Sequence, residues 1–505
     1  MDVFLAAAQS ILAPHMLLLV FLGVTAGLFV GALPGLTATM ALALMLPFTF
    51  TLDALEGLVA LGAVYMGTIY GGAFTAILIN TPGTPSSIAT TFDGHPMAKQ
   101  GRGLEAISIA TIASVVGGLV GVAFLLLAAP PLAKLAIRFG PAEMFWIAVL
   151  GLTLIGTLAS GSVLKGLLGG AIGLLIGTIG ISPIGGESRF TMGWPPLQGG
   201  VSLIVALIGL FVIPELLDMI RRGSAALAPP PGVAPSGFNF GSAARTVFSK
   251  PVNLIRSCLI GQVIAVIPGA GGSITSLVAY NEAKRASKSP ETFGKGNPEG
   301  LIASESSNNV MVAGSMVPLL ALGIPGAPPD AVILGVMLLH GLRPGLDLFT
   351  ESGVLANGFI LSMGLAALML IPVGLLGGQI IYRIVLRTPY YFLVPTILVI
   401  TMLGTYALRN NLLDIAIMLG LGVAGFLLRG LGIGAAPIVL GLILGTIAEQ
   451  GYVQTILGGM ALPVPQVRLF TNPLSQIIIA LIAAVLLWSF VPELLRRVRE
   501  RRRGE

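Results

Sequence analysis

The sequence predicts an all-α polytopic membrane protein with about a dozen spanning or half-spanning helices. Of its 505 residues, 55% are hydrophobic and only 10% are charged, whereas an ordinary soluble domain carries about 25% charged residues. Long segments have no Asp, Glu, Lys or Arg at all, for example residues 3–52, 57–92 and 106–133. Because a bilayer core needs about 20 apolar residues per helix, each of these segments is long enough for a membrane span.

Two halves of the chain match each other in order. Residues 27–35 resemble 261–269, and residues 71–85 resemble 314–328. We therefore predict a first membrane repeat over residues 1–222, a Pro/Gly-rich linker over 223–250, and a second repeat over 251–505. We compared the charges of three pairs of equivalent loops from the two halves. In two of the pairs the loops carry opposite charge bias, which favours inverted over parallel repeats.

The distribution of basic residues predicts the orientation. Residues 496–505 hold six Arg and two Glu directly after an apolar segment, and residues 281–295 are also net basic. Basic residues beside a span stay in the cytoplasm, so both segments are expected there. Contact with membrane lipids is expected on these grounds, and no nucleic-acid partner is expected, because the basic tail abuts a span.

Pro-Gly steps interrupt four apolar segments and predict broken helices or hairpins. Proline removes a helix hydrogen bond, and the helix that follows the break begins with free, electropositive N–H groups that bind anions. Interrupted segments at matching places in two halves are typical of a transporter's binding site. The predicted substrate-binding residues are Pro34, Gly35, Thr37, Thr39, Asn80, Pro82, Gly83, Thr84, Ser86, Gly269, Ser273, Thr275, Asn308, Asn309, Pro325 and Gly326.

Each of these polar residues has a simpler alternative role. A hydroxyl after a break can cap the new helix, and Asn80 can hydrogen-bond a neighbouring helix. Glu305 and Asp330 are the candidates for binding coupling ions, because ionisable residues at membrane depth are costly and usually functional. Asp330 can instead cap its helix, and Glu305 can lie at the membrane interface.

Other functional classes find less support. The sequence has no Walker motif, zinc-ligand pair or dinucleotide fingerprint, and we find no paired nucleophile and base, so no enzyme activity is expected. No cofactor is expected beyond sodium ions or protons as coupling ions, with sodium sites considered at the helix breaks. An anion-selective channel or another kind of secondary transporter is the alternative function, and a channel would show flux without saturation.

Several motifs resemble the large membrane subunit of tripartite tricarboxylate transporters. They cover residues 31–35, 70–85, 91–99, 305–309 and 322–326. The resemblance implies a multi-pass protein of the bacterial inner membrane that imports tricarboxylates or dicarboxylates by cation symport. It also implies a small membrane subunit and a periplasmic solute-binding protein as partners. The sequence departs from the family pattern at residues 328–330, where small and hydroxyl residues are more usual.

Overall fold

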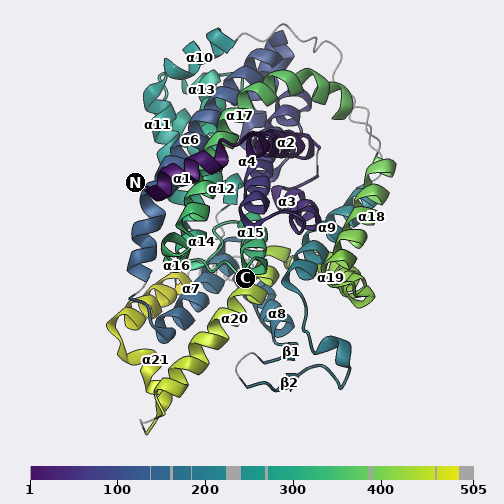
Figure 1. Cartoon of the computed structure of the whole chain (residues 1–505). Coiled ribbons are helices and arrows are strands. Elements are labelled where there is room, and N and C mark those ends of the chain that lie inside the picture. Colours follow the sequence, from purple (N-terminus) through teal and green to yellow (C-terminus); the bar gives the residue numbers. More distant parts are fainter. Residues whose placement is uncertain are drawn as a thin grey trace, which may run out of the picture. The chain divides into compact units, whose positions relative to one another are not determined.

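A computed structural model describes residues 2–33, 35–136, 138–159, 163–182, 185–222, 240–267, 271–385, 390–460 and 463–487. Within these residues, regular structure is helical except for one two-stranded sheet (Figure 1). Seven described helices are long and apolar enough to cross a membrane, or eight if one bent pair is a single span, and further apolar helices are shorter. The predicted all-α polytopic membrane fold is confirmed.

The chain folds into two compact units, and each unit combines segments from both predicted repeats. The first unit holds residues 1–133 and 211–410, and the second holds residues 134–210 and 411–505. Stretches that are far apart in the sequence therefore pack together within one unit. The division into repeats at residues 222 and 251 concerns sequence similarity rather than packing, and it stays a prediction.

Helices of the first unit come from two stretches of chain. The first stretch forms α1 (Asp2–Ile11), α2 (Pro14–Gly31), α3 (Ala38–Thr49), α4 (Ala54–Ile79), the short turn η1 (Pro85–Ser87), α5 (Ile88–Met97) and most of α6 (Gly103–Ala136). The second stretch forms the later part of α9 (Leu203–Arg222), α10 (Phe240–Phe248), α11 (Pro251–Ala265), α12 (Gly271–Ala286), α13 (Pro298–Gly314), α14 (Met316–Leu322), α15 (Pro328–Leu339), α16 (Leu346–Thr350), α17 (Gly353–Val385) and α18 (Tyr390–Arg409).

The second unit is smaller. It contains α7 (Pro141–Ala159), α8 (Val163–Gly177), strands β1 (Gly180–Ile181) and β2 (Ser188–Arg189), the start of α9, α19 (Leu412–Gly430), α20 (Ala435–Gly458), α21 (Arg468–Thr471) and a helix over Pro473–Leu487. The two strands pair antiparallel, with Gly180 opposite Arg189. Helix α20 packs along α7 and α8.

Part of the predicted linker is helical. Residues 240–248 form α10, in which Ala243 and Val247 recur four residues apart and are both buried. This spacing places them on one face, so the segment gains packing that an extended chain would lack. Residues 223–239 lie outside the described part of the chain, as do the basic residues 496–505 of the C-terminal tail.

Glycines bring α2 and α4 into backbone contact at the centre of the first unit, where Figure 1 shows the two helices side by side. A Cβ added to Gly27 would lie 2.3 Å from the carbonyl oxygen of Val64, and one added to Gly67 would lie 2.3 Å from that of Val24. Gly31 and Gly71 meet the partner backbone in the same way. Small residues repeated every four positions allow this close approach between membrane helices.

We expect Gly67→Ala to lower the thermal unfolding midpoint of the detergent-purified protein. The new methyl group cannot fit against the α2 backbone, and overpacking of this kind costs about 1–3 kcal/mol. Gly420→Ala is the matched control, because a Cβ there meets no atom within 4 Å. In the control, alanine should leave the midpoint unchanged or raise it, since alanine favours a helix over glycine. Equal midpoints for both variants would contradict the close packing of α2 and α4.

Short helices beside the breaks fit the predicted interruptions. Helices α3 and α15 have 12 residues each and α11 has 15, which correspond to lengths of about 18 and 22 Å. A hydrocarbon core is about 30 Å thick, so none of these helices can cross it alone. Helices of this length within a bilayer require the chain to turn inside it, which is tolerated only where protein or water satisfies the freed backbone groups.

Candidate functional site

All four helix breaks belong to the first unit. The described helices end and restart between α2 and α3, between α4 and η1, between α11 and α12, and between α14 and α15. Of the predicted site residues, Pro34 and Gly269 lie outside the described residues.

Hydroxyl groups gather at the second break. The Thr84 hydroxyl lies 3.0 Å from the hydroxyl oxygens of both Ser86 and Ser87, and all three side chains are buried. The backbone N–H of Gly83 donates to the Gly72 carbonyl at 3.3 Å. The break is therefore folded back onto α4, with its hydroxyls directed inward.

Asn80 and Pro82 precede this cluster in the chain. Asn80 is exposed and adopts the left-handed region with φ of 56°, where it ends α4 as a C-cap. Asparagine tolerates that backbone conformation better than most residues. Pro82 is partly buried between Asn80 and the cluster. The structure thus separates Asn80 from the hydroxyls of Thr84 and Ser86, although the sequence groups them.

The second and third breaks meet at α13. The Ser276 hydroxyl of α12 donates to the Ser86 carbonyl at 2.8 Å. A Cβ added to Gly272, at the start of α12, would lie 2.6 Å from the Ser86 Cβ and 3.0 Å from the Asn308 Oδ1 atom. Gly272, at the start of α12, therefore lies beside both Ser86 of the second break and Asn308 of α13.

Three buried side-chain amides at α13 and α11 lack partners. Among the described residues, Asn308, Asn309 and Gln262 make no side-chain hydrogen bond, although all three are buried. An unpaired buried donor or acceptor costs about 1–3 kcal/mol, and each amide offers two donors and one acceptor. Such groups suit a site that binds a polar ligand, because the ligand supplies the missing partners.

Two predicted residues on α12 bond within their own helix. The Thr275 hydroxyl donates to the Gly271 carbonyl at 2.9 Å, and the Ser273 carbonyl accepts from the Ser276 hydroxyl at 3.2 Å. Thr275 is fully buried, whereas Ser273 is partly exposed. Neither contact reaches Asn308.

At the first break the observed contacts are those of a helix start. The Thr37 hydroxyl accepts a hydrogen bond from the Met40 N–H at 3.2 Å, which makes Thr37 the N-cap of α3. Thr39 is buried two residues further on, and Gly35 has a φ of 94° that favours glycine. Helix α3 packs mainly against α4, α15 and α18.

The fourth break is closed by its own aspartate. Asp330 accepts a hydrogen bond from the Ala327 N–H at 2.7 Å and another from the Ser315 hydroxyl at 3.1 Å. Pro325 and Gly326 are buried, and a Cβ on Gly326 would lie 2.7 Å from the Ser315 carbonyl oxygen. These contacts make Asp330 a capping residue of α15 and hold the turn against α13.

Met311 of α13 links this fourth break to the third. It packs with Ala265, the last residue of α11, and with Ala327, the residue before α15. Met311 lies three residues after Asn308, so both side chains share one face of α13. Helix α13 is therefore the element around which the second, third and fourth breaks are assembled.

Glu305 is fully buried and is held by two other helices. One carboxylate oxygen accepts from the Thr90 hydroxyl of α5, and the other accepts from the Ser114 hydroxyl of α6 at 3.0 Å. The carboxylate is therefore enclosed between three helices, and its depth in the membrane stays a prediction. Thr90 and Ser114 were not among the predicted residues, because they lie on separate helices and no sequence spacing links them to Glu305.

Comparison with known proteins identifies the family of this chain. The model of the Tripartite tricarboxylate transporter TctA family matches residues 17–440. This chain belongs to the TctA family. It is 38% identical over 443 residues to the uncharacterized 52.8 kDa protein in the TAR-I ttuC' 3'region of Agrobacterium vitis, covering 88% of this chain and 87% of that protein.

A second relative supports the same assignment. The uncharacterized protein in the TAR-II ttuC' 3'region of Agrobacterium vitis is 37% identical over 191 residues, covering 38% of this chain and 78% of that protein. No solved structure matches this chain. Membership of the TctA family makes the chain a multi-pass membrane transporter, the membrane component of a tripartite system that includes other subunits.

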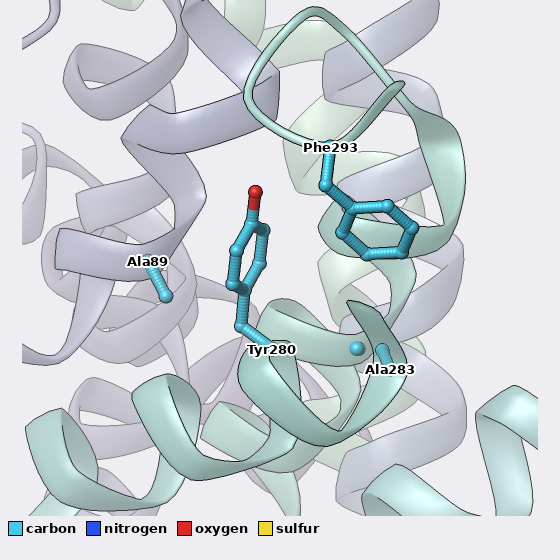
Figure 2. Packing of buried hydrophobic residues seen from close by; sticks show 5 residues of the cluster. Ala89, Tyr280, Ala283 and Phe293 are labelled. Carbon is cyan, nitrogen blue, oxygen red and sulfur yellow. The ribbon is translucent and has the colours of Figure 1, made fainter. Parts of the chain in front are cut away.

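In this TctA protein, Asp93 makes several contacts that the sequence did not predict. The buried Asp93 carboxylate accepts hydrogen bonds from the backbone N–H groups of Gly294, Gly296 and Asn297 at 2.8–2.9 Å, and from the Tyr280 hydroxyl at 2.9 Å. The Tyr280 ring lies between Ala89 and Phe293, as Figure 2 shows. Asp93 therefore fastens the 287–297 loop to α5. The motif at residues 91–99 contains it, but nothing in that motif indicates its partners.

Proposed function

We propose that the protein imports tricarboxylates and dicarboxylates across the bacterial inner membrane, driven by a sodium or proton gradient. Membership of the TctA family supports transport of this kind. The observation that carries the proposal is the meeting of Ser86, Gly272 and Asn308, where two helix breaks and an unpaired amide converge. Broken helices that converge in this way form substrate sites in other secondary transporters.

The chemistry of this meeting point suits a carboxylate. The polar side chains around it are amides and hydroxyls, which donate hydrogen bonds without adding charge, and the methyl group of Met311 lies beside them. The N–H groups at the start of α12 supply partial positive charge beside Gly272. A substrate with several carboxylates would need further compensation for its negative charge, and co-transported cations would provide it.

Glu305 is the proposed coupling residue. Its carboxylate and the hydroxyls of Thr90 and Ser114 form a buried set of oxygen atoms from three helices. Oxygen atoms of this kind bind sodium ions, and a buried carboxyl can alternatively carry a proton. Asn309 follows Glu305 by four residues and so lies on the same face of α13. Cation and substrate would thus be linked through one helix.

The proposed partners are a small membrane subunit and a periplasmic solute-binding protein that delivers the acid. The C-terminal tail is proposed to be cytoplasmic, since its basic residues directly follow an apolar segment. The basic loop at residues 284–295 would lie on the same side for the same reason.

Uptake into proteoliposomes tests this function. The vesicles would contain the chain with its small membrane subunit, and would receive labelled citrate or succinate, the purified binding protein and an imposed sodium or proton gradient. We expect saturable uptake that requires both the gradient and the binding protein. Flux that neither saturates nor responds to a gradient would instead indicate a channel, and uptake without the binding protein would contradict its proposed role.

A further inference from the structure

A separate cavity of about 600 Å³ lies between α11 and α12, remote in sequence from the break that joins these helices. Its lining combines charged, polar and apolar side chains: Arg256, Ile260, Val278, Asn281, Glu282 and Arg285. The cavity reaches the surface, because Val278 is 42% exposed and the Arg285 side chain is 80% exposed. The proposed transport function uses none of these residues.

Arg256 contributes a positive charge to the lining of this cavity. Its Nη2 atom donates to the Asn253 Oδ1 atom at 3.1 Å, while its Nε–H is buried and has no partner among the described residues. Arg285 is paired with Glu282 through two contacts of 2.9 and 3.0 Å. Two arginines and one glutamate leave one positive charge in excess, so the lining is complementary to an anion.

The same two helices expose an apolar face beside the cavity. The exposed large side chains on it are Val252, Ile255, Leu259, Val263 and Ile267 from α11 and its end, together with Ile274 and Val278 from α12. Those of α11 recur every three or four residues and thus form one continuous stripe. In a membrane protein such a stripe faces lipid chains.

The cavity lies away from the end of α11 and α12 at which the break occurs. A short connection joins α11 to α12, so the two helices run antiparallel, and the buried start of α12 lies against Asn308. The other end of the hairpin carries Arg256, Arg285 and the basic 284–295 loop. An apolar stripe that runs beside basic side chains is typical of a helix whose basic part lies at the level of the lipid headgroups.

We propose that this cavity binds the headgroup of an anionic phospholipid, whose acyl chains lie along the exposed face of α11 and α12. The phosphate would accept hydrogen bonds from Arg256 and Arg285, and glycerol hydroxyls would bond to the Asn281 amide. Guanidinium groups match phosphate oxygens in geometry as well as charge. The apolar side chains Ile260 and Val278 favour a lipid over a free phosphate, because a soluble anion gains nothing from them.

Native mass spectrometry of the detergent-purified full-length protein tests the site. The protein would be delipidated and then offered equal amounts of phosphatidylglycerol and phosphatidylcholine, and separately phosphatidylglycerol with excess glycerol 3-phosphate. We expect phosphatidylglycerol to be retained preferentially and glycerol 3-phosphate not to displace it. Arg256→Gln should lower this retention about fivefold, the change that corresponds to about 1 kcal/mol for each basic residue at a membrane surface.

Two variants keep the test specific to this cavity. Arg256→Lys preserves the positive charge and should retain most of the preference, whereas Arg343→Gln removes an exposed arginine that does not line the cavity and should retain all of it. Thermal unfolding of the lipid-free variants verifies that each is folded. Equal retention of both lipids, undiminished preference in Arg256→Gln, or displacement by glycerol 3-phosphate would overturn the proposal.

Discussion

Asn308→Ala is expected to lower carboxylate uptake by more than about tenfold while leaving the protein at least as stable as the wild type. A hydrogen bond to a charged group contributes about 1.5–3 kcal/mol, and 1.4 kcal/mol corresponds to a tenfold change. The Asn308 amide has no partner within the described chain, so its removal costs the fold no hydrogen bond. Uptake in proteoliposomes and the thermal unfolding midpoint would be measured on the same preparation.

Asn357→Ala is the matched control for this prediction. Its amide lies on α17 and donates to the Gly353 carbonyl of the same helix at 2.8 Å, so it has a purely local role. We expect wild-type uptake from this control. If Asn308→Ala transported normally, Asn308 would not belong to the binding site. If it lost uptake together with several degrees of thermal stability, the amide would serve the fold instead.

Glu305→Gln should abolish gradient-driven accumulation without unfolding the protein. Glutamine has nearly the same shape and can still accept a hydrogen bond from Thr90 or Ser114, but it carries no charge and cannot release a proton. Accumulation would be compared with the exchange of internal for external substrate. Exchange that continues without any ion indicates that a proton is carried, whereas exchange that is lost indicates a sodium site.

Glu143 supplies a comparable buried glutamate outside the proposed site. In the second unit, its carboxylate accepts from the Ser475 hydroxyl at 2.6 Å and from the Gly140 N–H at 2.8 Å. Glu143→Gln is expected to accumulate substrate like the wild type, even where its stability is lower. Normal accumulation by Glu305→Gln would exclude Glu305 from coupling.

The sequence predicted the features of this fold that depend on local chemistry. Charge-free segments predicted the membrane helices, and Pro-Gly steps predicted their interruption at α3, α11 and α15, because both signals act within one segment of chain. Asn308 and Asn309 were predicted to bind substrate, and both are buried. The roles assigned to the individual site residues stay predictions.

Contacts between distant segments could not be predicted from the sequence. Thr90 and Ser114 are ordinary hydroxyl residues in apolar helices, and only the packing of α5 and α6 against α13 makes them partners of Glu305. The Asp93 contacts depend in the same way on where the 287–297 loop folds. The exchange of segments between the two units has no local signal either, because apolar faces of similar composition can pack with many partners.

The glycine contacts between α2 and α4 constrain how the transporter can move. Helix α2 leads into the first break and α4 leads into the second, and a Cβ on Gly83 would lie only 2.1 Å from the Gly31 carbonyl oxygen. Interlocked backbones cannot slide along each other without first separating. We therefore expect the ends of α2 and α4 that carry the two breaks to move together as one rigid body, so that movement relative to the rest of the protein takes place at their outer surfaces.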